Sequence, residues 1–280
     1  MTLAMAAADD PPARSESGAL GGGTRTAFLI VLIAALASLY PFGSLIVTSI
    51  LPPLNGHPMQ LWQQLFTQIP VGTYMLNSAI VAGGAMVLVS IVSCMAGYGF
   101  AKLPFPGRAQ IFAILIAALS VPQATTIIAN YFNFARVGGI GAYWAPILMY
   151  AAGATPFSVI LMTNFFKALP DELVESAVID GATYRQVFTM IMAPLAAPAV
   201  TTVAVLCFLG SWNDLLVALL WLPDPGTRTI SVGIATLQGV RTNSIDLVLT
   251  GSLFSAIPPI VAFIVFQRYL VSGIVSGIGK

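Results

Sequence analysis

The feature that most constrains this chain is a long stretch without charge: no Asp, Glu, Lys or Arg lies between Arg25 and Lys102. Only 8% of the 280 residues are charged, whereas about a quarter of an average soluble domain is charged. Four more uncharged stretches follow, from Ala109 to Ala135, Val137 to Phe166, Gln186 to Asn213 and Leu247 to Gln267. Each is long enough for a helix that crosses a bilayer, which needs roughly 20 residues.

The length of these stretches also decides between helices and strands. Only helices and closed barrels satisfy their backbone groups in lipid. Barrel strands are far shorter and alternate polar with apolar residues, and no such alternation occurs here. We therefore expect an all-α polytopic membrane protein whose surface faces a lipid bilayer. The six predicted transmembrane helices cover residues 27–50, 74–101, 109–132, 142–166, 195–221 and 247–270.

The N-terminal residues differ in composition from the rest of the chain. Residues 1–25 are polar and contain Asp9-Asp10-Pro11-Pro12, which predicts a disordered tail. The following uncharged segment, Thr26 to Ile50, is too long for a signal-peptide core and has no evident cleavage site, so we expect it to remain as an anchor. Residues 26–280 then form one transmembrane domain.

The lysines and arginines predict the orientation of the chain. With six spans and a cytoplasmic N-terminus, eight cations fall on the inside and three on the outside, and the opposite topology would reverse this bias. We therefore expect both termini to be cytoplasmic in the cell membrane. The inside set is Arg14, Arg25, Lys102, Arg108, Lys167, Arg185, Arg268 and Lys280, and the outside set is Arg136, Arg228 and Arg241.

Several functional classes lack their sequence signatures. The net charge of +1 argues against a nucleic-acid partner, which would need a basic patch. Cys94 and Cys207 lie in apolar stretches and are interpreted as buried thiols, and His57 as a solvated loop residue. The sequence has no metal-ligand cluster, no catalytic constellation and no Walker-type phosphate loop. We therefore expect no enzyme activity, no metal and no cofactor bound by this chain.

The segment between the fourth and fifth spans, residues 168–194, is the most informative in the chain. Four of the ten acidic residues lie between positions 171 and 180, directly after Pro170. Proline and acids suit the first turn of a helix, where free N–H groups and the helix dipole favour negative charge. Gly181 provides the backbone freedom that ends a helix. We expect two short helices on the cytoplasmic side. The alternative is a polar connector, although connectors are usually only ~4–6 residues long.

The same segment resembles the "EAA" signature of the permease subunits of ATP-driven (ABC) importers. The match consists of Glu175-Ser176-Ala177, Gly181 and the run Ile191 to Pro194. Ser176 replaces an alanine of the family pattern and Ala193 replaces its leucine, while the glutamate, glycine and proline are present. The resemblance implies the type I importer fold and a cytoplasmic coupling helix that docks on an ATPase subunit. The coupling residues it implies are Glu172, Glu175, Ser176, Ala177, Asp180, Gly181 and Ala182.

Further segments resemble carbohydrate permeases of the maltose type, and the likeness runs from about residue 27 to 280. They are Gly97–Arg108, Pro156-Phe157, Phe165-Phe166, Ile179–Ala182, Trp212–Asp214 and Gln267–Gly273. This resemblance implies a heterodimer with a second permease, two ATPase subunits that bind ATP and Mg, an external solute-binding protein and a sugar substrate. It also implies a C-terminal tail that reaches between the ATPase subunits, for which a frayed chain end is the alternative.

Polar residues within the predicted spans are candidates for the translocation pathway. Asp214 is the one acid in a predicted span, and intramembrane acids are costly and commonly functional. A structural hydrogen bond is the alternative. The pathway candidates are Asn130, Asn133, Asn164, Trp212, Asn213 and Asp214. Amides in spans, including Asn77, can instead join helices to one another.

Three functions are compatible with these patterns. The first is sugar import. The second is an ABC permease for another solute, such as a glycerol phosphodiester or phosphate ester, but the interiors of the predicted spans contain no Lys or Arg, which favours a neutral solute. The third is of a different class, a secondary transporter or an intramembrane enzyme. No internal repeat and no intramembrane catalytic motif supports this third hypothesis.

Overall fold

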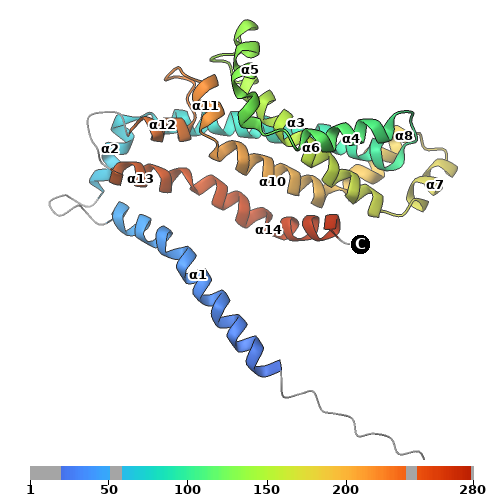
Figure 1. Cartoon of the computed structure of the whole chain (residues 1–280), viewed down its shortest axis with the longest axis horizontal. Coiled ribbons are helices and arrows are strands. Elements are labelled where there is room, and N and C mark those ends of the chain that lie inside the picture. The colour runs from blue at the N-terminus through green and yellow to red at the C-terminus, as the bar shows by residue number, and fades with distance from the viewer. Residues whose placement is uncertain (1–19, 51–58, 238–244, 279–280) are drawn as a thin grey trace, which may run out of the picture.

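The computed structural model describes residues 20–50, 59–237 and 245–278, and its secondary structure in these ranges is entirely helical (Figure 1). Residues 1–19 of the predicted tail and His57 lie outside the described residues, and α1 begins at Leu20. The elements are α1 (Leu20–Ile50), α2 (Gln60–Gln68), α3 (Val71–Lys102), α4 (Arg108–Ala118), α5 (Gln123–Arg136), α6 (Trp144–Ala168), α7 (Glu172–Ile179), α8 (Tyr184–Gln186), the π-helix η2 (Val187–Met192), α9 (Ala193–Leu195), α10 (Ala197–Asn213), α11 (Leu216–Trp221), α12 (Ile230–Thr236), α13 (Ile245–Ser255) and α14 (Ile257–Ile278).

Helices α3 and α6 form the centre of the bundle and pack against each other, with α10 beside α3 and α14 beside α10 (Figure 1). The contact between α3 and α6 is close because small residues lie at the crossing. A Cβ atom added to Gly97 would lie 2.5 Å from the Cβ of Met162, so no larger residue fits there. Small residues commonly allow membrane helices to approach in this way.

Several helices are suited to cross a membrane by length and composition. Three segments each qualify alone: α3, α6 and the run Ile245–Tyr269, which joins α13 to α14. Counting each bent helix pair as one span raises this number to five. In addition, α1 includes an apolar helix from Thr26 to Tyr40. The prediction of an all-α polytopic protein is therefore confirmed, whereas the described spans are less uniform than the six continuous helices expected.

Two of the predicted spans are wrong as continuous helices. The expected helix 109–132 is divided between α4 and α5, which meet at 99°. Pro122 explains the break, because it has no N–H to donate and disfavours a helical conformation in the preceding residue. The expected helix 195–221 ends early, since Asp214 has an extended backbone (φ −72°, ψ 132°) that separates α10 from α11. A 70° bend also separates Tyr184–Leu195 from α10.

The two ends of the bundle carry different short elements. At one end α2 and α12 pack with α13 and the start of α3 around a second apolar cluster (Figure 1). Asn77 stabilises this end, because its Nδ2 donates to the carbonyls of Gly226 and Arg228 at 3.0 and 2.9 Å. Tyr143 donates its hydroxyl to Oδ1 of the same amide at 2.8 Å. The opposite end carries α7 and α8 (Figure 1).

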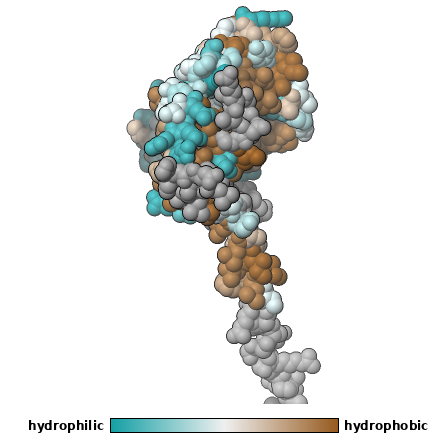
Figure 2. Space-filling model, turned by 90° about the vertical axis from the view of Figure 1, so that its left-hand side faces the viewer, coloured by the Kyte–Doolittle hydropathy of each residue, from teal (hydrophilic) through white to brown (hydrophobic). Residues whose placement is uncertain are grey.

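The outer surface of the bundle is largely apolar. Figure 2 views the molecule from the end that carries α2 and α12, where hydrophilic side chains gather, while apolar side chains cover much of the flank and the protruding helix α1. Phe28 and Tyr40 on α1 are 67% and 77% exposed. Such a surface is suited to contact with lipid or with another membrane subunit.

Candidate coupling element and transport cavity

The segment between α6 and α10 forms the predicted pair of short helices, and α7 is the first of them. Glu172 and Glu175 lie in its first turn, where the helix dipole favours acids. Its C-terminus is closed by a Schellman motif, in which the N–H of Ala182 donates to the carbonyl of Ala177 at 2.9 Å and the N–H of Gly181 to that of Val178 at 3.0 Å. Gly181 adopts φ +87°, a conformation that a residue with a Cβ rarely adopts.

The second half of the segment is capped and buried immediately after this glycine. Thr183 and Gln186 form a reciprocal capping box at the start of α8. The π-helix η2 follows, and its residues Val187 and Met192 are fully buried in the main core. Phe188 packs on Tyr98 of α3 with ring centroids 5.1 Å apart. These contacts attach the exposed α7 to the membrane bundle through α8 and η2.

Lys102, the last residue of α3, holds the start of the segment in place. Its ammonium donates to the carbonyl of Leu169 at 2.7 Å and forms an ion pair with Asp171. The Lys102 side chain is only 3% exposed, whereas that of Asp171 is 77% exposed. From the sequence, Lys102 contributed to the predicted orientation and to the resemblance of the segment Gly97–Arg108. Its contact with Asp171 could not be predicted, since two residues 69 positions apart leave no local signal.

The exposed face of the segment, which we call the coupling face, combines acids with apolar side chains. Glu172, Glu175, Ser176, Asp180 and Gly181 are exposed, as a docking surface requires. Ala177 is buried and Ala182 half-buried, so these two predicted residues pack inward. The apolar members are Val178, Ile179, Tyr184 and Met190, of which Ile179 is the most exposed at 85%. Large apolar groups beside acids are typical of a protein interface and not of a solvated linker.

A cavity of about 310 Å³ lies between α5, α6, α10 and Asp214. Its polar lining includes Gln123, Tyr150, Ser158, Ser211 and Asp214, with Phe157 as an aromatic wall. Tyr150 donates its hydroxyl to Oδ1 of Asp214 at 2.9 Å, and the same oxygen accepts the N–H of Val217 at 2.8 Å. Asp214 therefore caps α11 and also borders the cavity, and its place on the translocation pathway stays a prediction.

Comparison with known proteins then gives the family. Residues 90–276, more than half of the chain, match the model of the family described as "Binding-protein-dependent transport system inner membrane component". The chain belongs to this family. This permease is therefore the transmembrane subunit of a binding-protein-dependent ABC importer, a multi-pass inner-membrane protein without an ATPase domain of its own. The alternative of a secondary transporter or intramembrane enzyme is wrong.

Individual relatives resemble the permease over most of its length. The osmoprotective compounds uptake permease protein GgtD of Synechocystis is 33% identical over 250 residues, which cover 86% of this chain and 84% of that protein. The trehalose/maltose transport system permease protein MalG of Thermococcus litoralis is 31% identical over 259 residues, 88% of this chain and 93% of that protein.

A solved structure confirms the fold. A chain of a bacterial ABC transporter involved in the import of the acidic polysaccharide alginate superposes with a TM-score of 0.78 at 22% identity. The superposition covers 92% of this chain and 99% of that one. The permease therefore has the ABC-importer permease fold that the resemblance implied.

The structure separates the remaining pathway candidates from the cavity. Trp212 is buried in the second apolar cluster and donates its Nε1–H to the carbonyl of Ser255 at 3.0 Å. Asn213 donates to the carbonyl of Leu209 at 2.9 Å, one turn earlier on α10. Asn130 donates to Thr126 on its own helix at 3.3 Å. Asn133 and Asn164 are exposed, and neither lines the cavity.

Among the six candidates, only Asp214 lines this cavity. The residues that accompany it, Gln123, Tyr150 and Ser158, were missed by the sequence analysis. Pro122 and Pro156 gave the available signal, because prolines in predicted spans mark places where helices bend and open space between neighbours. Within the described residues no three His, Cys, Asp or Glu side chains lie close enough together to hold a metal ion.

Proposed function

We propose that this permease imports a neutral sugar or glycoside through the cavity that contains Tyr150 and Asp214. The observation that carries this proposal is the chemistry of the lining: an amide, hydroxyls and one carboxylate beside the ring of Phe157, with no Lys or Arg. Planar polar groups and aromatic faces are the groups that orient uncharged polyhydroxy ligands in pockets. A phosphate ester or glycerol phosphodiester would favour a cation, and the second hypothesis is therefore the weaker one.

The names of relatives support a sugar. Besides the trehalose/maltose permease, they include the alpha-glucoside transport system permease protein AglG of Rhizobium meliloti at 31% identity. The melibiose/raffinose/stachyose import permease protein MelC of Bacillus subtilis is 28% identical. These names describe the relatives. They support a sugar as the substrate of this permease only together with the hydrogen-bonding cavity, whose lining contains no cation.

We further propose that the coupling face docks on an ATPase subunit and that the importer contains two such subunits, which bind ATP and Mg, and a second permease. The acids and apolar groups of the coupling face suit a groove with a cation and an apolar floor. Helix α1 supports the second permease, because its apolar side chains lie largely exposed and it leaves the bundle (Figure 1). Both termini would be cytoplasmic, with residues 26–280 as the transmembrane domain and the coupling segment 168–194 on the same side.

The test of the transport proposal uses the permease with its co-purifying subunits and its solute-binding protein in proteoliposomes. A panel of labelled trehalose, maltose, melibiose and a glycerol phosphodiester is offered on the binding-protein side. We expect ATP-dependent accumulation of one of the sugars. Accumulation of the phosphodiester alone would contradict a neutral substrate.

The orientation has a separate test. Single cysteines at positions 18 and 226, in a background without Cys94 and Cys207, are exposed to an impermeant thiol reagent in whole cells. We expect labelling at 226 and not at 18, because the cation bias places only the second position outside. Equal labelling at both positions would overturn the orientation.

A further inference from the structure

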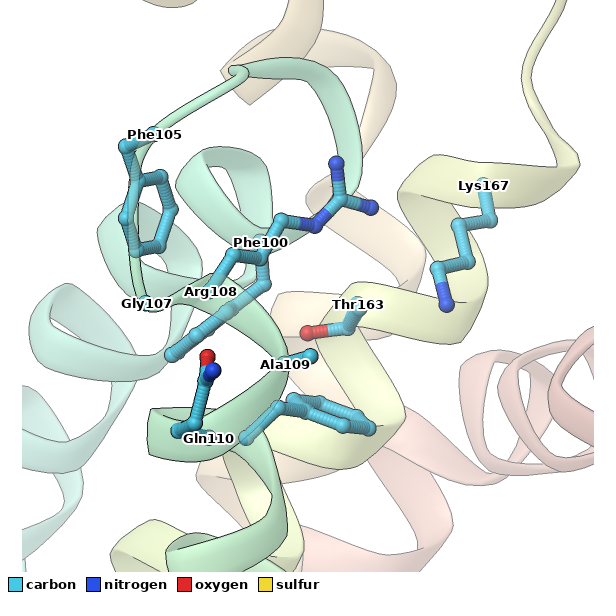
Figure 3. A pocket seen from close by; sticks show the side chains of 9 residues that line it. Phe100, Phe105, Gly107, Arg108, Ala109, Gln110, Thr163 and Lys167 are labelled. Atoms are coloured by element: carbon cyan, nitrogen blue, oxygen red, sulfur yellow. The ribbon is translucent and has the colours of Figure 1, made fainter.

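A second cavity, of about 510 Å³, lies near the C-terminal end of α6, between the end of α3 and the beginning of α4 (Figure 3). It shares no lining residue with the transport cavity. Arg108 and Lys167 approach it from α4 and α6, and Thr163 lies between them (Figure 3). The transport and coupling roles described above use none of these three residues, so the cavity calls for an explanation of its own.

The two cations of this cavity lack acidic partners within the described residues. Lys102 and Asp171 form the one ion pair found among the described residues, so neither Arg108 nor Lys167 has an acidic partner there. The ammonium of Lys167 lies 5.6 Å from the centre of the Phe112 ring. Two cations from different helices that share a cavity repel each other, and an anion between them removes that cost. The planar guanidinium of Arg108 suits a phosphate, whose oxygens accept two parallel N–H bonds.

The neutral polar groups of the cavity add to this preference. The first helical residue of α4 is Arg108, directly after Gly107 at φ +80°, and the helix has no side-chain cap. The N–H groups of its first turn therefore remain as donors beside the two cations. Thr163 is 1% exposed and donates its hydroxyl proton to the carbonyl of Val159 at 2.7 Å. Its oxygen can still accept a hydrogen bond from a hydroxyl of the ligand.

The position of the cavity favours a lipid over a soluble phosphate. It lies where the candidate spans α3 and α6 end, and each of these helices has a lysine in its last turn. The ends of transmembrane helices lie at the level of the lipid headgroups. Three aromatic residues, Phe100, Phe105 and Phe112, form its apolar wall. Helix α4 buries none of its residues, and Ile114 on it is 68% exposed. A phospholipid matches this combination, because its phosphate suits the two cations and its acyl chains suit the aromatic wall and the exposed apolar side chains of α4.

We infer that the Arg108–Lys167 cavity binds the headgroup phosphate of an anionic phospholipid whose acyl chains lie along α4. Cationic pockets between transmembrane helices at the headgroup level are suited to this class of ligand. The site is independent of the solute that the importer carries, and its test requires no transport. The lipid would hold the ends of α3, α4 and α6 together beside Lys102, the residue that fixes the coupling segment.

The test is a lipid titration of the full chain, purified with its co-purifying subunits, followed by native mass spectrometry. The probes are phosphatidylglycerol, phosphatidylcholine and inorganic phosphate. We expect one phosphatidylglycerol to bind more tightly than any phosphatidylcholine. Arg108→Gln and Lys167→Gln should each weaken that binding about fivefold, and the double variant about 25-fold. Arg136→Gln is the matched control, because Arg136 is an exposed cation at the end of α5, outside the cavity, and should change nothing.

A charge-preserving variant guards against misfolding: Arg108→Lys combined with Lys167→Arg should keep the preference for phosphatidylglycerol. Inorganic phosphate should not displace the lipid beyond the effect of chloride at equal ionic strength. Unchanged binding in the double glutamine variant would overturn the inference. Displacement by inorganic phosphate would assign the site to a soluble anion and overturn it as well. A third result would also overturn the inference: in a lipid-free complex, the second permease protects Arg108 and Lys167 from chemical labelling. The cavity would then be a subunit interface.

Discussion

The coupling segment and the transport cavity are built in opposite ways. The coupling segment lies within one continuous run of chain, and its shape depends on caps between residues at most five positions apart, such as Ala182 to Ala177 and Thr183 to Gln186. The cavity joins α5, α6 and α10, and its central hydrogen bond links Tyr150 to Asp214, 64 positions later. The coupling segment can therefore be predicted from the sequence, whereas the cavity depends on how the helices pack.

This difference has a consequence for the function proposed above. A locally capped element keeps its shape when the helices around it move, so it can transmit a displacement from an ATPase as a rigid piece. A cavity lined by several helices changes its shape whenever those helices shift. Alternating access needs both properties, since one region must stay rigid while the other opens and closes. The following predictions test whether the two regions behave in this way.

The largest effect is expected at Gly181. A β-branched residue disfavours φ +87°, and Gly181→Val should break the Schellman motif. A Cβ at this position would meet no atom within 4 Å, so the effect would come from the backbone and not from a clash. We expect loss of ATPase-subunit retention and of uptake with normal membrane insertion, scored by pull-down and transport. Gly181→Asn is the control, because Asn tolerates this conformation, and it should keep most of both activities. Full activity of the valine variant would show that the segment needs no fixed shape.

The next effect is expected at Glu175 on the coupling face. Charge reversal in Glu175→Lys should oppose the dipole of α7 and break a charged contact with the ATPase subunit, which can cost ~2–5 kcal/mol at an interface. The measurement is the affinity of the purified ATPase for permease in nanodiscs. Asp224→Lys provides a matched control, since Asp224 is an exposed acid near the other end of the bundle. Equal weakening by both variants would indicate a general charge effect and not docking by α7.

The same contrast explains how far the sequence predicted the structure. The predicted spans 74–101 and 142–166 match α3 and α6 within three residues at each end, because long uncharged runs depend on composition alone. The coupling helices were predicted from Pro170, the acids and Gly181, which act within one or two helical turns. Helices α2 and α12 were missed, since both are only two to three turns long and are stabilised by packing, α2 against α13 and α12 against α3 and α13.

The cavity shows the limit of sequence reasoning more clearly. Asp214 was expected inside a continuous helix, yet it ends α10 and caps α11 through the N–H of Val217. Trp212 was expected beside it on the pathway, but it points into the second apolar cluster. Adjacent residues on a helix face different directions, and which direction is inward depends on neighbours that the local sequence does not contain.

A smaller effect is expected from Tyr150→Phe, which removes the hydroxyl that donates to Asp214 and leaves the cap of α11 intact. A net hydrogen bond is worth ~0.5–1.5 kcal/mol, so we expect the half-saturating sugar concentration for uptake to rise about two- to tenfold. Asp214→Asn keeps an oxygen for the N–H of Val217 and should preserve assembly, whereas Asp214→Ala should also lower the thermal stability of the complex by about 1 kcal/mol. Uptake that is unchanged in both Tyr150→Phe and Asp214→Asn would place the sugar elsewhere.

The smallest effect is expected at Asp171, where the coupling segment joins α3, because the ion pair of Lys102 and Asp171 is unequal. Asp171 is 77% exposed, and an exposed carboxylate contributes little since water screens it. Asp171→Asn should therefore change stability by less than ~1 kcal/mol and leave ATPase retention intact. Lys102 is 3% exposed and also donates to the carbonyl of Leu169. Lys102→Met leaves that carbonyl without its donor, which costs ~1–3 kcal/mol if water cannot replace it. Thermal unfolding of the two variants measures the difference directly. Equal destabilisation would show that the two charges hold the segment as a pair, and that the attachment of the coupling segment depends on the ion pair and not on the buried lysine.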